Sequence, residues 1–484
     1  MSVDLESLGL IDDHPAEECA VVGIYAPGHD VSRLAYFALY ALQHRGQESS
    51  GIAVSDGKQF ECYKDMGLVS QVFNPEILQR LQGHLAVAHN RYSTTGSSRI
   101  DNAQPLLLKS HLGQLALAHN GNLTNYLELK NELLARGLTF ATTSDTEVVL
   151  KIFSLAEGDT LAQKLVNTVR RLFGSYSVVL ATPDALMGFR DPLGVRPLCI
   201  GRIGGERKDD GWVLASESCG LATIGATFVR EVRPGEAVII DRGGLQSVQA
   251  AELEHHALCL FEYVYFARPD TLINGDNIYN ARYRMGQHLA REYPADADLV
   301  IAVPDSGVPA AMGYADESGI PYGEGLIKNR YIARTFIQPD DNMRKVGIKL
   351  KFNPLTHNIH GKRIVMIDDS IVRGNTTRAL VKLLKDEGVK EVHVRITSPP
   401  MIHPCFYGVD TATHEQLIAH KYEVPDICKY IGADSLGYLS LDALMEDTGY
   451  PRQNLCRACF TGQYPGESAG REQPLRTCQG AAAT

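Results

Sequence analysis

Short runs of apolar, often β-branched residues dominate the chain from Cys19 to about residue 250, and Gly, Pro, Asn and Asp separate them. Runs of this kind predict β-strands. The expected strands are Ala20–Tyr25, Gly51–Val54, Leu85–His89, Leu115–His119, Tyr176–Thr182 and Trp212–Ala215. Helical periodicity predicts helices over Ser32–Leu42, Leu123–Ala135, Asp145–Leu155 and Leu161–Leu172. Short strands with interleaved helices but no steady alternation favour a layered α+β domain.

The pattern changes beyond about residue 270, where apolar runs alternate with helical stretches. Such alternation favours a parallel sheet in a doubly wound α/β domain. Its expected strands are Asp298–Val303, Pro321–Ile327, Arg363–Ile367 and Glu391–Thr397, and a helix is expected over Thr377–Lys385. The polar and basic segment Gln338–Pro354 fits either a mobile flap over a site or a solvated surface loop.

Composition narrows the class of protein. The 484 residues include 47 Lys and Arg against 57 Asp and Glu, which gives a formal net charge of −10. This balance disfavours sequence-independent nucleic-acid binding, which depends on basic side chains that neutralise phosphates. No apolar run reaches the ~18 residues that a membrane span needs. We therefore expect a cytoplasmic enzyme with neither a membrane nor a nucleic-acid partner.

Both ends of the chain are expected to lie outside the folded domains. Residues 1–18 are rich in Asp and Glu and contain no Lys or Arg. This composition matches neither a secretory signal nor a transit peptide, and we interpret it as a short acidic leader in front of the first apolar strand. The residues at the other end, 466–484, are rich in Gly, Ala, Glu and Arg and predict a flexible tail.

The sharpest motif runs from Val365 to Thr377, where an apolar strand ends in two adjacent carboxylates and a hydroxyl-rich turn leads into a helix. Backbone N–H groups at a helix N-terminus suit a phosphate, and paired carboxylates suit vicinal hydroxyls or Mg²⁺. An Asp-Asp turn that only caps a helix is the structural alternative. The full string resembles the 5-phosphoribosyl-1-diphosphate (PRPP) motif of type I phosphoribosyltransferases. The resemblance implies PRPP binding by Asp368, Asp369, Arg373, Gly374, Asn375, Thr376 and Thr377.

The same resemblance implies a metal and contacts to the diphosphate. The transferred ribose C1 passes through an oxocarbenium-like state, so Mg²⁺ and basic side chains on the leaving diphosphate are expected. One Mg²⁺ per subunit is expected, with Ser306, Asp368 and Asp369 as candidate residues, because the Val-Pro-Asp-Ser-Gly sequence around Ser306 resembles the family's second loop. Lys328 and Arg330 are candidates for the diphosphate, and solvated surface cations are the alternative.

Cys19 is a candidate nucleophile if it becomes the first residue of the chain. An N-terminal cysteine can use its own α-amino group as the base, since that amine titrates near ~8. Such a site also needs an oxyanion hole, and Asn120 and Gly121 offer a side-chain amide and a backbone N–H. Arg91 is a candidate for holding the substrate's α-carboxylate, and Asp145 for its α-amino group.

Each of these residues also has an ordinary structural interpretation: an ion pair for Arg91, a hairpin turn for Asn120-Gly121 and a helix N-cap for Asp145. Together and in this order, with the segment Leu42–Ser49, they resemble the N-terminal-nucleophile glutamine amidotransferases. The resemblance implies an αββα fold, the catalytic roles above and glutamine as substrate. The sequence departs from the family's more usual glycine directly after the cysteine, where it has alanine.

A glutaminase half followed by a PRPP half is the arrangement of the amidophosphoribosyltransferase family, and the resemblance covers nearly the whole chain. It implies a glutamine amidotransferase domain over 19–255 and an α/β type I phosphoribosyltransferase domain, with a mostly parallel sheet, over 256–465. The implied reaction opens de novo purine synthesis: glutamine, PRPP and water give 5-phosphoribosylamine, diphosphate and glutamate. Ammonia would pass internally between the two active sites.

The resemblance further implies a homotetramer and feedback inhibition by purine nucleotides. The aromatic segment Phe261–Asp270 would couple the sites and line the ammonia path, although an interdomain core fits it equally well. The motifs also bear on two other functions. An amidotransferase acting on another phosphosugar is disfavoured by the Asp368-Asp369 motif, and a non-catalytic PRPP-fold regulator would have no reason to keep the glutaminase residues in order.

Cysteine spacing adds a third candidate site. Cys456 and Cys459 form a C-x-x-C near the C-terminus, with Cys259 and Cys405 far upstream. Spacing alone leaves zinc, an iron–sulfur cluster, a redox pair and coincidence open. One branch of the family has both a removed leader and cysteines in these four contexts, which implies a structural, oxygen-sensitive [4Fe–4S] cluster. The remaining cysteines are interpreted as small buried residues or incidental thiols.

Overall fold

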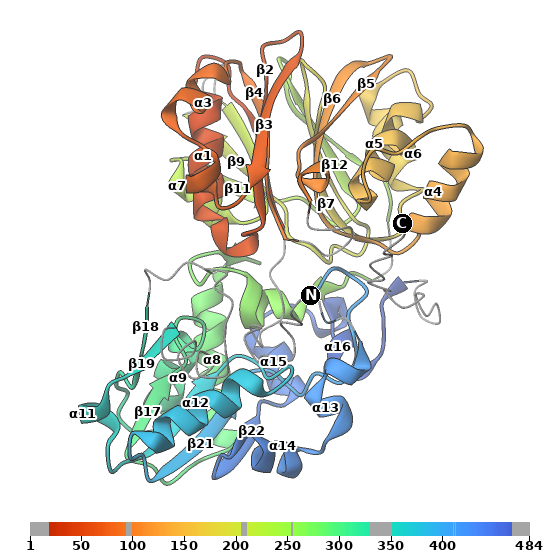
Figure 1. The fold of residues 1–484 in the computed structure, drawn as a ribbon. Coiled ribbons are helices and arrows are strands. Elements are labelled where there is room, and N and C mark those ends of the chain that lie inside the picture. The colour runs from red at the N-terminus through yellow and green to blue at the C-terminus, as the bar shows by residue number, and fades with distance from the viewer. Residues whose placement is uncertain are drawn as a thin grey trace, which may run out of the picture.

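The computed structural model describes residues 19–92, 99–204, 211–252, 255–329, 351–409, 411 and 413–466. The chain folds into two halves, which lie one above the other in Figure 1. The expected leader, nearly all of the expected tail, Arg330 and most of the segment Gln338–Pro354 lie outside the described residues. Among the helices that are described, none is long and apolar enough to cross a lipid bilayer.

The N-terminal half contains two sheets that pack face to face. The first has the strand order β11-β9-β10-β1-β4-β2-β3, and neighbouring strands run antiparallel. Its strands are β1 Ala20–Tyr25, β2 Ser49–Ser55, β3 Phe60–Met66, β4 Leu85–Arg91, β9 Cys199–Ile203, β10 Gly211–Ala215 and β11 Thr227–Glu231.

The second sheet has the order β13-β12-β8-β7-β6-β5 and is also antiparallel. Its strands are β5 Leu106–Ser110, β6 Gly113–Leu123, β7 Gly174–Ala181, β8 Leu186–Arg190, β12 Glu236–Asp241 and β13 Gly244–Gln249. Side chains from both sheets, among them Val21, Val87, Val179 and Leu186, form one buried core between them. Burial of both inner faces holds the sheets together.

Helices cover the outer face of each sheet (Figure 1). The first sheet packs against α1 Val31–Ala41, α2 Val69–Val72, α3 Pro75–Arg80 and α7 Ser218–Thr223. The second packs against α4 Tyr126–Ala135, α5 Asp145–Leu155 and α6 Leu161–Val169. The layers therefore follow the order αββα, which confirms the fold class expected for this half.

The C-terminal half is built on a parallel sheet with the order β17-β20-β21-β22. Its strands are β17 Leu299–Ala302, β20 Arg363–Asp368, β21 Glu391–Ile396 and β22 Ser435–Tyr438. One face packs against α8 Ile278–Glu292, α9 Val308–Ser318 and α15 Leu441–Asp447. The other packs against α11 Thr356–Ile359, α12 Asn375–Asp386 and α14 Val424–Ile431. Helices on both faces of a parallel sheet confirm the expected doubly wound α/β fold.

Smaller elements connect the two halves and complete the second one. A five-residue π-helix over Glu262–Phe266 lies at the junction. Three two-stranded pairings and two short helices accompany it: β14 Leu258–Cys259 with β23 Leu455–Cys456, β15 Leu272–Ile273 with β16 Asp276–Asn277, β18 Leu326–Lys328 with β19 Phe352–Pro354, α13 Ile418–Lys421 and α16 Ala458–Thr461.

One expected strand of the parallel sheet is wrong. The run Pro321–Ile327 makes a single bridge to the sheet, between Tyr322 and Val300, and then leaves it. Its last residues form β18 and pair antiparallel with β19. Proline and two glycines in this run weaken a ladder of backbone hydrogen bonds. The helix expected from Leu123 also begins later, at Tyr126, because Leu123 still pairs with Gly174 of β7.

Candidate active sites

Cys19 lies at the start of β1, with β4 running antiparallel beside it. The residue is only 7% exposed. Its Sγ donates to the Tyr92 carbonyl oxygen at 3.3 Å and accepts from the Tyr92 N–H at 3.4 Å. Burial raises the pKa of the Cys19 thiol to about 11, and the Tyr92 hydrogen bond and the charge of Arg91 oppose this only in part. A thiol in this place is neutral near pH 7 and needs a base to become a nucleophile.

Arg91 is the last residue of β4, and its side chain is almost fully buried. Its Nη1 lies 2.7 Å from Glu48 Oε1, so Arg91 does form the ion pair that is its structural interpretation, with a partner that the sequence did not identify. The charges of both residues act on the pKa of Cys19, which places the pair near the thiol. An arginine that a carboxylate already orients is well suited to bind the carboxylate of a substrate.

Asp145 is the first residue of α5, and Ser144 occupies the N-cap position that the sequence analysis considered for Asp145. Asp145 Oδ2 accepts from the Leu123 N–H at 3.1 Å, and Oδ1 lies 3.5 Å from His119 Nδ1. Burial alone would raise the pKa of the Asp145 carboxyl, but His119 and the backbone donors hold it below its usual value. Asp145 is therefore a buried, charged carboxylate of the kind that suits an ammonium group.

Asn120 and Gly121 lie within strand β6 and not in a hairpin turn. Asn120 is buried, and its Nδ2 has no hydrogen-bond partner in the part of the chain that the structure describes. Gly121 has a φ of +136°, and a Cβ there would come within 2.1 Å of the Ser175 carbonyl oxygen. Only glycine fits this position. A buried amide donor that makes no internal hydrogen bond is available to a developing oxyanion.

The paired aspartates lie at the carboxyl end of β20, an interior strand of the parallel sheet. Asp368 and Asp369 are each only 1% exposed. The Asp369 N–H donates to Asp368 Oδ1 at 3.0 Å, and Ser370 Oγ donates to Asp369 Oδ1 at 2.6 Å. These bonds orient two carboxylates at the edge of the sheet where ligands bind in α/β folds.

The turn after the aspartates leads into α12, as the sequence predicted. Gly374 has a φ of +82°, and a Cβ there would approach Ile418 Cδ1 to 2.8 Å. The Arg373 guanidinium donates to Gln416 Oε1 at 2.7 Å, and Tyr430 Oη donates to Asn375 Oδ1 at 2.9 Å. These side-chain contacts support the turn. The other two candidate PRPP-binding residues of the turn differ in exposure: Thr377 is buried and Thr376 is half-buried.

Two further candidates reach the same edge of the sheet. Ser306 lies in the loop between β17 and α9, and β17 is the parallel neighbour of β20. Lys328, at the end of β18, places its Nζ 2.9 Å from Asp305 Oδ2 in that loop. The structure therefore brings Ser306, Lys328 and the paired aspartates to loops that open at one edge, whereas Arg330 lies outside the described residues.

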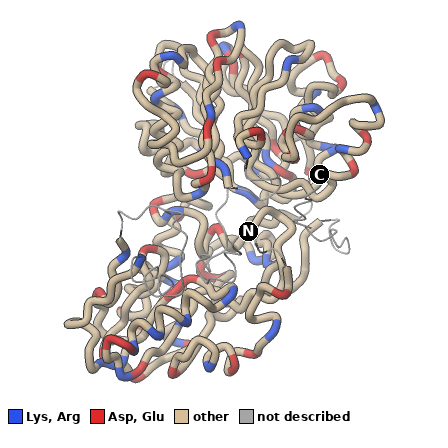
Figure 2. Tube along the Cα trace, viewed as in Figure 1, with Lys and Arg blue, Asp and Glu red and all other residues tan. Residues whose placement is uncertain are grey.

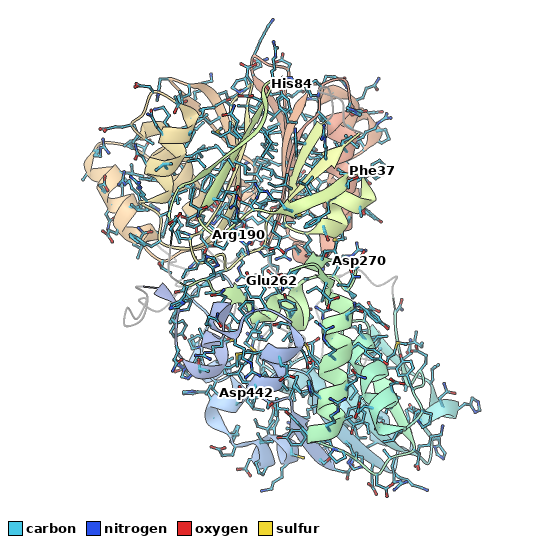
Figure 3. All side chains as sticks on the ribbon, turned by 180° about the vertical axis from the view of Figure 1, so that it is seen from behind. Phe37, His84, Arg190, Glu262, Asp270 and Asp442 are labelled. Carbon is cyan, nitrogen blue, oxygen red and sulfur yellow. The ribbon has the colours of Figure 1, made fainter. Side chains whose placement is uncertain are left out.

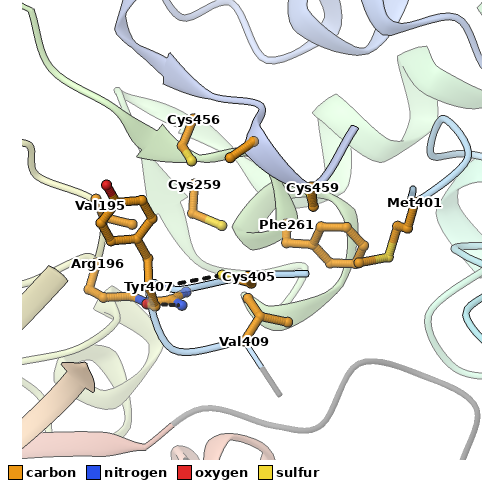
Figure 4. A pocket seen from close by; sticks show the side chains of 11 residues that line it. Val195, Arg196, Cys259, Phe261, Met401, Cys405, Tyr407, Val409, Cys456 and Cys459 are labelled. Atoms are coloured by element: carbon orange, nitrogen blue, oxygen red, sulfur yellow. Dashed lines mark hydrogen bonds between the residues drawn. The ribbon is translucent and has the colours of Figure 1, made fainter. Parts of the chain in front are cut away.

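The four candidate cysteines meet at one small cavity of about 20 Å³ (Figure 4). Cys259 and Cys456 are register partners in the β14–β23 pairing. Cys405 Sγ accepts from the Tyr407 N–H at 3.3 Å. Burial raises the pKa of the thiols of Cys259 and Cys456 to about 12, and it raises the pKa of the Cys459 thiol well above its usual value.

The four cysteines are not arranged as a site for a single metal ion. Within the described ranges, no group of three or more His, Cys, Asp or Glu side chains is arranged to hold one metal ion. The other residues that line the cavity are Val195, Arg196, Phe261, Met401, Tyr407, Val409 and Ala458. The cysteines thus surround a shared space, and one of its walls carries a buried cation, Arg196.

A buried cluster of charges between the two halves was not predicted. Arg45 pairs with Glu217 at 2.6 Å and with Glu262 at 2.8 Å, and Arg196 lies 3.7 Å from Glu262. Figure 2 shows charged residues of both signs where the halves meet. Arg45 belongs to the Leu42–Ser49 motif, but nothing in the sequence marks its two carboxylate partners, since both lie far along the chain.

Both halves match models of known domain families. Residues 89–223 match the glutamine amidotransferase domain, and residues 274–397 match the phosphoribosyl transferase domain. This order of domains, with the geometry above, defines a glutamine-dependent phosphoribosyltransferase.

Curated relatives match over nearly the full length of the chain. The amidophosphoribosyltransferase of Synechococcus elongatus is 55% identical over 469 residues, which cover 96% of this chain and 95% of that protein. That of Archaeoglobus fulgidus is 50% identical over 464 residues and covers 94% and 99% of the two chains. The chain belongs to the amidophosphoribosyltransferase family.

Solved structures agree with this assignment. The glutamine PRPP amidotransferase of B. subtilis, in complex with ADP and GMP, superposes with a TM-score of 0.88 at 43% identity and covers 94% of this chain and 99% of that one. A structure described as the allosteric regulatory enzyme of purine biosynthesis gives a TM-score of 0.87 at 44% identity, and the match covers 92% of this chain and 96% of that one. The chain is thus an enzyme of the first step of purine biosynthesis, and the two alternative functions are not favoured.

Proposed function

We propose that Cys19, once removal of residues 1–18 has freed its α-amino group, is the nucleophile that hydrolyses glutamine. The amine takes the thiol proton, and Sγ attacks the carbon of the side-chain amide. The C–N bond then breaks, ammonia leaves with the proton, and water hydrolyses the thioester to glutamate and free thiol. The observation that carries this proposal is the buried Nδ2 of Asn120, which has no hydrogen-bond partner among the described residues and which, with the Gly121 N–H, would stabilise the oxyanion.

Glutamine binding is proposed to depend on two charged side chains near the nucleophile. Arg91, oriented by Glu48, would bind the α-carboxylate, and Asp145 would bind the α-ammonium group. Arg91 directly precedes Tyr92, whose main chain hydrogen-bonds to Cys19 Sγ, and the charges of Arg91 and Asp145 both act on the pKa of Cys19, which supports this assignment. Binding both ends of the substrate would place its side-chain amide at Sγ.

The second site is proposed to bind PRPP at the carboxyl ends of β17 and β20. Asp368 and Asp369 would orient the ribose hydroxyls, and the turn that contains Arg373, Gly374, Asn375, Thr376 and Thr377 would hold the 5-phosphate at the N-terminus of α12. Lys328 and Arg330 would contact the diphosphate. Ammonia would attack ribose C1 and form the C–N bond while the bond from C1 to the diphosphate breaks.

One Mg²⁺ per subunit is part of this proposal, with Ser306, Asp368 and Asp369 as its protein residues. The donors fit, because Mg²⁺ is usually held by one or two carboxylates together with substrate phosphates and needs no cage of several side chains. When bound, the ion would neutralise charge that develops on the diphosphate. The hydrogen bonds from the Asp369 N–H and Ser370 fix the two carboxylates in advance.

Ammonia is proposed to pass between the sites along the junction segment Phe261–Asp270. The aromatic side chains of Phe261, Tyr263 and Phe266 are buried there, within the main core of the C-terminal half. An apolar wall suits a neutral molecule and excludes water, which supports a route through this segment.

Cys259, Cys405, Cys456 and Cys459 are proposed to hold a [4Fe–4S] cluster of structural role, which would make the enzyme sensitive to oxygen. Four thiols at one cavity match the Cys₄ donor set of such clusters. Ligand binding requires thiolates, and the buried guanidinium of Arg196 in the cavity wall would offset part of their negative charge. The proposed reaction transfers no electrons, so the group would add stability and not redox chemistry.

The remaining features follow the family. The relative from B. subtilis was solved with ADP and GMP, which supports inhibition of this enzyme by purine nucleotides. We propose a cytoplasmic homotetramer that binds no nucleic acid. Its chain would comprise a removed leader at 1–18, an amidotransferase domain at 19–255, a phosphoribosyltransferase domain at 256–465 and a flexible tail at 466–484.

The two-site proposal is tested by Cys19→Ala. The variant should lose PRPP-dependent turnover with glutamine by about three orders of magnitude or more, yet keep turnover with ammonium, because the second site does not use the thiol. Cys62→Ala, which changes another cysteine of the same domain, should keep both activities. Loss of the ammonium-dependent rate in Cys19→Ala, with an unchanged thermal midpoint, would contradict the assignment of the two reactions to two separate sites.

A further inference from the structure

The cluster of charges at the junction includes residues from both halves. Arg45, after α1, and Glu217, after β10, come from the amidotransferase half, whereas Glu262 is the first residue of the π-helix. Figure 3 shows Glu262 where the two halves meet. All three side chains are fully buried, so each charge depends on its partners and not on water.

Arg45 links this cluster to the nucleophile. Its Nε donates to the main-chain carbonyl oxygen of Cys19 at 3.3 Å. Its Nη1 and Nη2 donate to the two carboxylate oxygens of Glu262 at 3.0 and 2.8 Å, and Nη1 also donates to Glu217 at 2.6 Å. Glu262 of the second domain therefore fixes the orientation of the Arg45 guanidinium through Nη1 and Nη2. The Nε of the same guanidinium holds the backbone of Cys19.

The π-helix that begins at Glu262 is held by a residue of the C-terminal half. Arg282 of α8 donates to the carbonyl oxygens of Tyr263 and Ala267, which fixes the π-helix against α8. Arg282 is buried, and Asp369 is the carboxylate whose charge acts most strongly on it. Contacts thus run from Arg282 through the π-helix to Arg45, and the charge of Asp369 in the second site acts on Arg282. π-Helical turns of this kind often occur at functional positions.

We propose that Glu262 is a positioning residue of the glutamine site, supplied by the phosphoribosyltransferase domain, which acts through Arg45 on the backbone of Cys19. This inference rests on the proposed role of Cys19 as nucleophile and adds a residue from the other domain to its support. Movement of the π-helix when PRPP binds beside Asp369 would change the position of Arg45 and, with it, the thiol. The glutamine site is therefore complete only when both domains are in place.

A purely structural role predicts a different outcome. If Glu262 only joined the two domains, its loss would weaken both activities together or lower stability alone. A positioning role predicts that glutamine-dependent turnover falls while ammonium-dependent turnover stays. It also predicts a change in the reactivity of the Cys19 thiol, because the carbonyl that Arg45 holds belongs to that residue.

The test compares Glu262→Gln and Glu262→Asp with a matched control. Gln keeps the size but replaces one acceptor by a donor that faces Arg45, and Asp keeps the charge but shortens the side chain. The control is Glu236→Gln, since Glu236 is an equally buried carboxylate paired with Arg230 at 2.7 Å, and neither residue contacts Arg45 or Cys19. The full-length purified enzyme is used throughout.

Three measurements decide the question: initial rates with glutamine, initial rates with ammonium, and the rate of iodoacetamide labelling of Cys19 with and without PRPP. We expect Glu262→Gln to lower kcat/KM for glutamine by about tenfold or more, to keep the ammonium rate within about twofold, and to abolish any effect of PRPP on labelling. Glu262→Asp should show a smaller change of the same kind, and Glu236→Gln none.

The inference is overturned if Glu262→Gln and Glu262→Asp lower both rates in parallel, or if neither rate nor labelling changes. Should Glu262→Gln fail to fold, Glu262→Asp gives the decision, because it keeps the buried charge balanced. An unmodified enzyme that used ammonium with PRPP but not glutamine would instead refute the role of Cys19. The failure of the inference and that of the proposed function are therefore distinguishable.

Discussion

A thiol that packs against backbone atoms loses the water that would stabilise its thiolate, and Cys19 is in this position. Burial raises the pKa of its thiol to about 11 as long as a peptide bond joins it to residue 18. At pH 8 such a thiol is ionised in roughly one molecule in a thousand. Reactivity at Cys19 therefore requires a base, and cleavage of that peptide bond would create one on the same residue.

We expect removal of the leader to change the pH dependence of alkylation at Cys19. In the full-length chain the rate should rise about tenfold per pH unit up to about pH 10, because only the thiolate reacts. In the chain that begins at Cys19 it should level off near ~8, where the α-amino group titrates. Mass spectrometry of iodoacetamide-labelled peptides measures both profiles. Identical profiles would argue against the amine as the base.

Asn120 allows a second test at this scale, because its side-chain N–H₂ is the proposed oxyanion donor. Asn120→Ala should lower kcat for glutamine hydrolysis by about 10²–10³ with little change in KM, since the donor acts mainly in the transition state. Turnover with ammonium should be unchanged, which controls for folding. A rise in KM with unchanged kcat would show instead that Asn120 binds the substrate. Steady-state kinetics with each nitrogen donor gives the answer.

Elements carry the functional residues at their ends, and the turn from β20 into α12 is the clearest case. It places two carboxylates, a glycine with positive φ and a helix N-terminus within a few residues. The left-handed conformation costs an L-residue with a Cβ roughly 1–2 kcal/mol. At Gly374 a Cβ would also press on Ile418, so the effect of a substitution there goes beyond backbone strain.

Gly374→Ala and Gly319→Ala separate these effects. Gly319 ends α9 with a φ of +72°, and a Cβ there would meet nothing within 4 Å. Gly319→Ala should lower stability slightly and leave the kinetics alone. Gly374→Ala should raise KM for PRPP several-fold in the ammonium-dependent reaction, because the turn must shift to relieve the contact. Equal KM values for PRPP in the two variants would refute a role for this turn in PRPP binding.

Strands and helices were predicted correctly from the sequence where a local pattern of residues determines them. The strand Ala20–Tyr25 and the helix Asp145–Leu155 were predicted with the bounds that the structure has, since a short apolar run marks the first and helical periodicity marks the second. Asn120-Gly121 was predicted as a pair, but its position in a strand depends on pairing with β7, about fifty residues later. Local sequence does not encode such a partner.

The candidate sites show the same difference between residues that a local motif marks and contacts that depend on tertiary packing. Motifs led to Cys19, Arg91 and the paired aspartates, because each lies in a short and distinctive string. Glu48 as the partner of Arg91, and Glu262 as the partner of Arg45, were missed. Both contacts follow from tertiary packing, and an isolated glutamate in a sequence has no feature that distinguishes a buried partner from a solvated surface charge.

For the whole molecule, the four cysteines link distant parts of the C-terminal half to one another and to Arg196 of the N-terminal half. If the proposed [4Fe–4S] cluster is present, Cys459→Ser should prevent it from assembling, lower the iron and sulfide content and reduce the thermal midpoint, because thiolate ligands and folding are coupled. Cys428→Ser is the control, as Cys428 is a half-buried free thiol away from the cavity. Iron and sulfide analysis with an absorption spectrum checks this, and a colourless, zinc-loaded parent protein would contradict the assignment.

The pairing of β14 with β23 sets an order of events during biosynthesis. Cys259 is synthesised well before its register partner Cys456 and the neighbouring Cys459, because most of the C-terminal half lies between them in the sequence. The cavity can therefore close only after both sheets of the first half and the parallel sheet of the second have been made. A nascent or truncated chain that lacks residues 455–459 cannot complete the four-thiol site, so loading of the proposed cluster would have to wait until this segment has been synthesised.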